Sequence, residues 1–269
     1  MSERGATIVE TLTAMVVAGI ITTGLISVFV PANRLSTQVS TAGEMQENAR
    51  SALALVSNEL RHVSRGGVLF ASADSLVVRY PVALGALCAN DGSYVTAYLP
   101  ATGDSIPVGQ VEGYAFADTL GDWAYTSMSG SSFLPYATNG NSSCTALGGG
   151  QAGTGSQYYR WAVSASQGPG TPFMVWSRRS FRFAPSLLDP SSRALRVGGP
   201  GRMIEIARGF SSTTRFEYRQ NGQTTWTSTP SSGWLNSLDA VRVVATMTAE
   251  GSDGEALDVT REAHFLNAN

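Results

Sequence analysis

The chain has 269 residues, with 18 basic and 20 acidic side chains, and its net charge is −2. Hydrophobic residues make up 43% of it, which is enough for a sizeable core and excludes a chain that is disordered throughout. Every basic residue is an arginine. The sequence therefore excludes a P-loop lysine for nucleotide phosphates, a Schiff-base lysine for pyridoxal phosphate and a kinase-type lysine.

The first predicted element is an apolar helix over residues 6–30. It contains one charged residue, Glu10, and would be about 37 Å long, enough to cross a bilayer. A carboxylate inside the hydrocarbon costs roughly 2.5–3.5 kcal/mol, so Glu10 is a functional candidate. If the chain were cut after Gly5, the new amino group of Ala6 on a neighbouring helix could neutralise Glu10. The alternative is that Glu10 lies near the headgroups, where the start of the helix favours a negative charge.

Residues 31–66 are predicted to continue the same helix beyond a bend at Pro31. Gly66 and Gly67 are predicted to end it. Spacings of three and four residues indicate one apolar face, made by Leu35, Val39, Ala42, Met45, Ala49, Leu53, Val56, Leu60 and Val63. We expect this half to pack on a globular domain, whereas the membrane half would be bare. A free coiled-coil dimer is the alternative for the outer half.

Residues 67–269 are predicted to form a β-rich globular domain, so the expected fold class is α+β, a long helix packed on an antiparallel sheet. Asn221-Gly222 predicts a tight turn, and residues 127–157 predict a long irregular loop. Alternating and β-branched patterns predict strands at 75–80, 94–99, 158–163, 173–177, 180–183, 203–207, 214–219, 240–248 and 261–266.

The two cysteines, Cys88 and Cys144, lack the C-x-x-C spacing of redox and metal motifs. In an exported protein they would most simply pair as a disulfide, and two buried free thiols are the alternative. Closing a loop of that length would stabilise the fold by roughly 4 kcal/mol in the chain-entropy model.

Three parts of the sequence carry a resemblance to a known family. The first is a short leader that ends in Gly5 and is followed by a chain with Glu10 at its fifth position, as in type IV prepilins. The other two resemble the minor pilin family called PilW and the J-type pseudopilins of type II secretion. They are the helical stretch Gln46-Glu47-Asn48-Ala49-Arg50 with its continuation to Arg61, and the C-terminal pattern Phe216-Glu217-Tyr218-Arg219, Asn221-Gly222, Trp226, Val241-Arg242-Val243-Val244 and residues 261–267.

This resemblance implies a structural subunit of a type IV pilus-like filament. Residues 1–5 would be a leader that prepilin peptidase removes after Gly5, and Ala6 would then be N-methylated. The subunit would span the inner membrane once, and an assembly platform would move it into a periplasmic or cell-surface filament of other pilins. Glu10 would neutralise the N-terminus of a neighbouring subunit there. The length favours a minor pilin that initiates or primes assembly.

Three other functions remain open from the sequence. The chain could be a J-type type II secretion pseudopilin, which shares all of these features. It could also be a pilus-tip adhesin or DNA-uptake pilin, or a signal-anchored periplasmic domain in which Gly5 is never cut.

Residues 160–219 contain ten arginines and three acids, so their charge is strongly positive. One interpretation is a DNA-contacting patch, with Arg178, Arg179 and Arg182 as the candidate residues. The other is that these arginines pair with the acidic segments of the same chain or with neighbouring subunits. The second interpretation is favoured, because clustering in sequence is not clustering on a surface.

An enzyme is not predicted. No G-x-S-x-G motif is present, and the two histidines, His62 and His264, have no metal-ligand or triad context. We therefore expect no catalytic residues, no metal site and no cofactor. The five tryptophans could form a carbohydrate-binding surface, but in a β-rich domain they are more often core residues.

Overall fold

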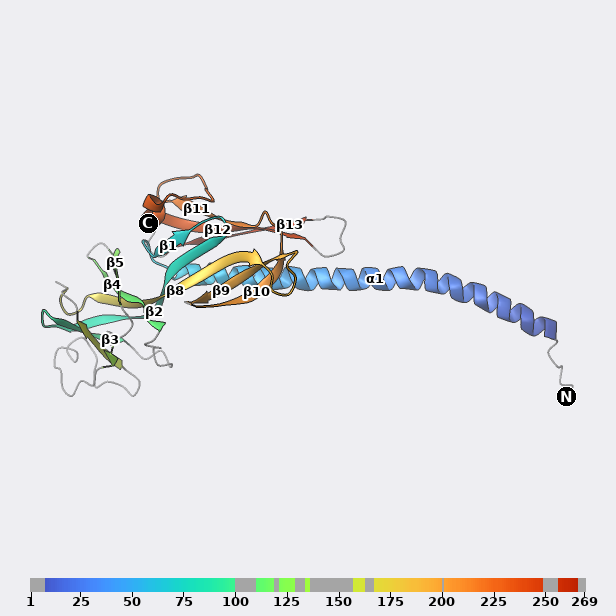
Figure 1. Ribbon diagram of the computed structural model, residues 1–269, viewed down its shortest axis with the longest axis horizontal. Helices are drawn as coiled ribbons and strands as arrows, with labels where there is room; N and C mark the ends of the chain where they lie inside the picture. Colours follow the sequence, from blue (N-terminus) through green and yellow to red (C-terminus); the bar gives the residue numbers. More distant parts are fainter. Residues whose placement is uncertain are drawn as a thin grey trace.

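The computed structural model describes residues 8–99, 110–118, 121–128, 134–135, 157–162, 167–199, 201–248 and 256–265. In this part of the chain, a long helix extends far beyond a 13-stranded sheet (Figure 1). The elements are α1 (Ile8–Arg61), β1 (Val68–Ala71), β2 (Ser75–Asn90), β3 (Tyr94–Leu99), β4 (Gly113–Ala117), β5 (Trp123–Ser127), β6 (Leu134–Pro135), β7 (Gln157–Ala162), β8 (Pro172–Pro185), β9 (Arg193–Gly199), β10 (Arg202–Phe210), β11 (Arg215–Gln220), the 3-10 helix η2 (Ser232–Ser237), β12 (Leu238–Thr248) and β13 (Ala256–His264).

Helix α1 has 54 residues and is therefore about 80 Å long. It continues through Pro31 and curves over its N-terminal half (Figure 1). The predicted end at Gly66 and Gly67 is wrong, because α1 ends at Arg61. Hydrogen bonds from Val63 N to Leu60 O and from Gly67 N to Ser64 O close tighter turns there, and Gly66 then takes a left-handed φ of 76°.

The predicted apolar face of the outer half of α1 is confirmed from Ala49 onward. Ala49, Leu53, Val56, Leu60 and Val63 are buried. Val39, which the same spacing placed on this face, is 65% exposed. The side chains of Leu35 and Ala42 lie outside the described residues. Met45 lies against Gly209 of β10, where a Cβ would be 2.6 Å from the Met45 Cε atom.

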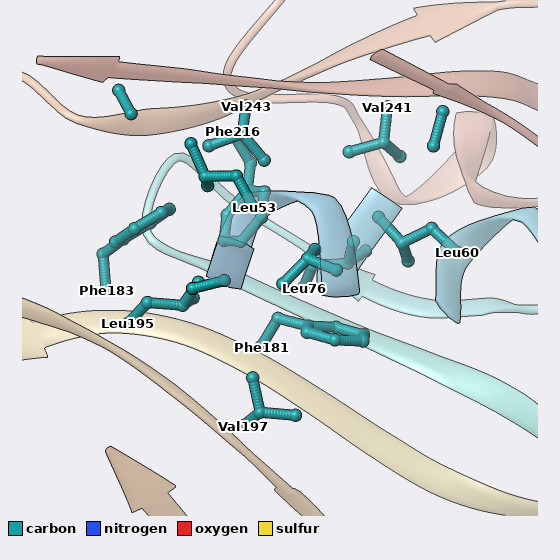
Figure 2. Close-up of a cluster of buried hydrophobic side chains, with 14 of the residues drawn as sticks. Leu53, Leu60, Leu76, Phe181, Phe183, Leu195, Val197, Phe216, Val241 and Val243 are labelled. Atoms are coloured by element: carbon teal, nitrogen blue, oxygen red, sulfur yellow. The ribbon is translucent and has the colours of Figure 1, made fainter. Parts of the chain in front are cut away.

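The sheet curves around the C-terminal end of α1, so strands pack on two sides of the helix (Figure 2). Figure 2 shows Leu53 and Leu60 of α1 between two groups of side chains from the sheet. Phe216, Val241 and Val243 come from β11 and β12, and the facing group comes from β2, β8 and β9: Leu76, Phe181, Phe183, Leu195 and Val197. From Ala49 onward the helix packs in this core, which contradicts the alternative of a free coiled-coil dimer for that stretch.

Strands β2 and β8 form a long antiparallel pair that joins two cores. Leu76 and Phe181 belong to the core around α1, whereas Leu87 and Phe173 belong to a second core with Trp161 of β7. A bulge between Pro81 and Ala83 shifts the register of β2 by one residue. The shift exchanges the faces on which β2 side chains lie, so the same strand supplies both cores.

Several predicted strands have other limits in the structure. The segments 173–177 and 180–183 are one strand, β8, because the intervening Arg178 and Arg179 form ion pairs with Glu112 and Glu59 and do not break the ladder. The strand predicted at 75–80 extends to Asn90, and β13 begins at Ala256. Five strands were not predicted: β1, β4, β5, β6 and β9. The predicted turn at Asn221-Gly222 is confirmed, with Gly222 at a φ of 78°.

The fold class is α+β, a long N-terminal helix whose C-terminal end packs on a large antiparallel sheet. Most of the predicted loop at 127–157 lies outside the described residues, but two of its residues form β6, which pairs with β7.

The burial of this helix face leads to a prediction about the stability of the fold. Leu53→Ala removes a side chain that is 0% exposed in the main core, and we expect it to lower the free energy of unfolding by about 2–5 kcal/mol. Leu55→Ala is the matched control, because Leu55 lies on the same helix but is 47% exposed. Denaturant unfolding of the full chain in detergent micelles measures both. Equal losses for the two variants would contradict the burial of this helix face.

Candidate functional site

The N-terminal half of α1 is a continuous apolar surface that nothing in the described chain covers. Residues Ile8–Arg34 have a mean hydropathy of 2.2 in their most apolar window, none of which is buried. Ile8, Met15, Ile20, Leu25 and Phe29 are each more than half exposed. The segment is long and apolar enough to cross a membrane, and its complete exposure separates it from the core helix of a globular domain.

Hydroxyl groups along this segment are satisfied within the helix itself. Thr22 donates to the carbonyl of Ala18 at 2.7 Å, and Thr23 donates to the carbonyl of Gly19 at 2.8 Å. Ser27 similarly donates to the carbonyl of Gly24. Such bonds remove the cost of placing an unpaired hydroxyl in an apolar environment. The threonines and serine therefore do not prevent this half of α1 from being covered by lipid or by other helices.

Glu10 lies in the first turn of α1 and is exposed, at the end of the apolar segment farthest from the sheet. The start of a helix favours a negative charge at this position. Gly5 and Ala6, the predicted cleavage and methylation positions, lie outside the described residues.

Cys88 is buried in β2, within the part of the sheet that contains the second core. It is engaged in a disulfide. Cys144, its predicted partner, lies outside the described residues, so the pairing of the two stays a prediction.

The three arginines proposed for DNA contact do not lie on one face of β8. Side chains alternate along a strand, so Arg178 and Arg182 lie on the face opposite to Arg179. Arg179 turns toward α1, where Nε and Nη2 donate to Glu59 at 2.8 and 2.7 Å. The same two atoms of Arg178 donate to Glu112 at 2.9 Å each. Arg182 is exposed and forms no ion pair with a described residue.

Pairing with acids extends beyond these residues. Six of the ten arginines between residues 160 and 219 form an ion pair in the described part of the chain. The remaining pairs join Arg160 with Asp91, Arg193 with Asp74, Arg215 with Glu217, and Arg219 with Asp239. Except for Arg215 and Glu217, which lie on the same strand, these pairs join the arginines to acids that are distant in sequence. These contacts favour the interpretation of the arginines as partners of the acidic segments.

A row of alternating charges crosses the outer strands of the sheet. Glu217 of β11 lies opposite Arg242 of β12, which lies opposite Glu262 of β13. Both oxygens of Glu217 are engaged, one by Arg215 at 2.7 Å and the other by Arg242 at 2.6 Å. The ring of Trp226 covers the Arg242 guanidinium, whose centre is 4.5 Å from the ring centroid. Burial alone would raise the pKa of Glu217, but its bonds to both arginines outweigh burial and lower that pKa.

Sequence reasoning missed the acids that anchor these arginines. Glu59 and Glu112 are separated from Arg179 and Arg178 by long stretches of chain, and no local pattern links them. The tryptophans divide between two roles: Trp161 and Trp176 are core residues, whereas Trp234 is 38% exposed. Within the described ranges, no group of three or more histidine, cysteine, aspartate or glutamate side chains could hold a metal ion.

The Glu217 cluster predicts a pH-dependent contribution to stability. Glu217→Gln removes the charge on a buried carboxylate with two arginine partners, and we expect it to lower the free energy of unfolding at pH 7 by about 1–3 kcal/mol. Because folding lowers the pKa of Glu217, the wild-type advantage is complete above the ordinary carboxyl pKa of 4.5 and is lost as pH falls through the lowered value. Unfolding curves of both proteins at pH 7 and pH 3 measure it, with exposed Glu47→Gln as the control. An advantage that persists unchanged at pH 3 would contradict the assignment.

No protein-family model matches this chain, and neither the curated proteins nor the solved structures contain a significant match to it.

Proposed function

We propose that the chain is a structural subunit of a type IV pilus-like filament, a minor pilin that initiates or primes assembly. One observation carries this proposal. A single helix packs one face of its C-terminal part, from Ala49 onward, on its own sheet, whereas its segment Ile8–Arg34 is apolar and entirely uncovered. Such a helix needs a second apolar environment outside the folded domain.

Two environments fit the uncovered half, and the proposed function uses both in turn. Before assembly the segment crosses the inner membrane once, with the β-rich domain on the periplasmic side. After assembly the same side chains pack against the helices of neighbouring subunits in a periplasmic or cell-surface filament. Transfer from lipid to a helix bundle keeps the apolar surface away from water at each stage. The rigid connection through α1 then fixes where the domain lies relative to the filament axis.

Glu10 has a specific role in this proposal. The leader that ends in Gly5 is removed by prepilin peptidase, and the N-terminus of Ala6 is methylated. The methylated amine stays positive and pairs with Glu10 of an adjacent subunit. A charge in apolar surroundings is costly unless an opposite charge lies beside it. Neighbouring helices therefore favour the axial register that brings the amine and Glu10 together.

The partners are other pilins or pseudopilins, prepilin peptidase and an inner-membrane assembly platform. A J-type pseudopilin of type II secretion would use the same helix and the same glutamate, and the test below separates it by where the protein accumulates. The DNA-uptake alternative has less support, because Arg178 and Arg179 are occupied by glutamates of the same chain. No catalytic step is part of the proposal.

Glu10→Ala tests the proposal in cells. We expect normal amounts of the protein in the membrane fraction, because removing a charge from an apolar segment favours insertion. We expect it to fall at least tenfold in filaments sheared from the cell surface, which corresponds to about 1.4 kcal/mol or more of lost assembly free energy. Quantitative immunoblots of both fractions measure the effect.

Glu44→Ala is the matched control, because Glu44 is exposed on the same helix but lies outside the apolar segment. It should enter filaments as the wild type does. Normal incorporation of Glu10→Ala would contradict the proposed role of Glu10. Wild-type protein that stays in the membrane fraction and is absent from sheared filaments would instead favour the pseudopilin function.

A further inference from the structure

A pocket lies where the end of α1 meets β2, β5 and η2. Its cavity volume is about 400 Å³. Two arginines line it, Arg65 from the turn after α1 and Arg79 from β2. Trp123 and Tyr125 of β5 form an aromatic wall, and Asp122 is the one acid among the described residues that line it.

Arg79 is held firmly in this pocket. Its Nη1 atom donates to the carbonyl of Gly66 at 2.7 Å. The centre of its guanidinium lies 4.7 Å from the Tyr125 ring centroid and 5.3 Å from that of Trp176. These contacts fix the plane of the group and use one of its three nitrogens. The opposite edge, made by Nε and Nη2, is left for another partner.

That edge has no carboxylate in the described part of the chain. Nε of Arg79 is buried there without a hydrogen-bond partner, and so is Nε1 of Trp123 in the same pocket. Arg178, Arg179 and Arg219 each present the same Nε and Nη2 edge to an acid. Arg79 therefore differs from them in lacking the acid. Burial without a counter-charge lowers the pKa of Arg79, and an anion at this edge would offset that effect.

We propose that this pocket binds a carboxylate, which pairs with the Nε and Nη2 edge of Arg79 and accepts a hydrogen bond from Trp123 Nε1. A planar carboxylate matches this edge with two parallel bonds. Arg65 adds a second positive charge at the pocket, whereas Asp122 weakens binding by repulsion. Neither Arg79 Nε nor Trp123 Nε1 is exposed at the molecular surface. Entry of the carboxylate therefore requires the half-buried Trp123 side chain to shift.

Titration of the full chain in non-ionic detergent with sodium acetate tests this proposal. Sodium chloride replaces acetate at constant ionic strength as the control. We expect a saturable change in tryptophan fluorescence with acetate and none with chloride. Arg65→Gln should weaken acetate binding about five-fold, and Asp122→Asn should strengthen it by a similar factor. Arg61→Gln, which changes an exposed arginine outside the pocket, should have no effect.

Arg79→Gln should abolish binding. Because Arg79 also donates to the Gly66 carbonyl, this variant could fail to fold. The Arg65 and Asp122 variants then decide the test. A response without saturation, or equal responses to acetate and chloride, would overturn the proposal. So would an unchanged affinity in both the Arg65 and Asp122 variants.

The carboxylate could belong to a free acid or to an acidic side chain of a neighbouring subunit, and only the second source rests on the proposed filament function. If a neighbour supplies it, Arg65→Gln should also reduce the amount of protein in sheared filaments. If a free acid supplies it, filament recovery stays at the wild-type level while acetate binding weakens. Because the titration uses the unassembled chain, failure of the filament function would leave its result interpretable.

Discussion

The uncovered apolar half of α1 is the constraint on which the account of this protein depends. Burying apolar surface is the dominant favourable contribution to folding, yet this helix leaves a membrane-length segment outside its own domain. The buried face of α1 begins only at Ala49. A helix that is firmly packed at one end and bare at the other can place its domain at a fixed position on whatever covers the bare half. Filament assembly is the proposed use of that arrangement.

The β-rich domain is organised around the long pair of β2 and β8. Its two cores would be independent without these strands, and the bulge after Pro81 lets β2 contribute to both. Ion pairs strengthen the link between helix and sheet, since Glu59 of α1 binds Arg179 of β8 with two bonds. Much of the arginine charge thus serves contacts between segments that are distant in sequence.

Periodicity alone predicted the outer helix face, because residues from Ala49 to Val63 repeat at helical spacing and meet the sheet. It failed at Val39, where the pattern continues but the side chain is 65% exposed. Strand β4 was missed because Gly113 weakens its pattern. Gly113 is nevertheless required, since a Cβ there would lie 2.3 Å from the Trp176 ring. The sequence predicts a break between strands at Arg178 and Arg179, because nothing local indicates that distant glutamates pair with both arginines.

The candidate sites also differ in how far the sequence predicts them. Glu10 and the apolar segment were evident from the sequence, since one charge within a long apolar run is a local signal. The pocket around Arg79 was not, because it combines the end of α1 with β2, β5 and η2. Its importance depends on which atom of Arg79 lacks a partner, and that is a property of three-dimensional packing.

Mass spectrometry of the native N-terminus, comparing membranes with filaments sheared from the cell surface, tests the central claim most directly. If the chain is a filament subunit, it begins at a methylated Ala6 both in the membranes and in the sheared filaments. An intact N-terminus ahead of Gly5 in both fractions, or cleavage at another position, would contradict it. The protein would then be a membrane-tethered β domain whose bare helix has no role in a filament.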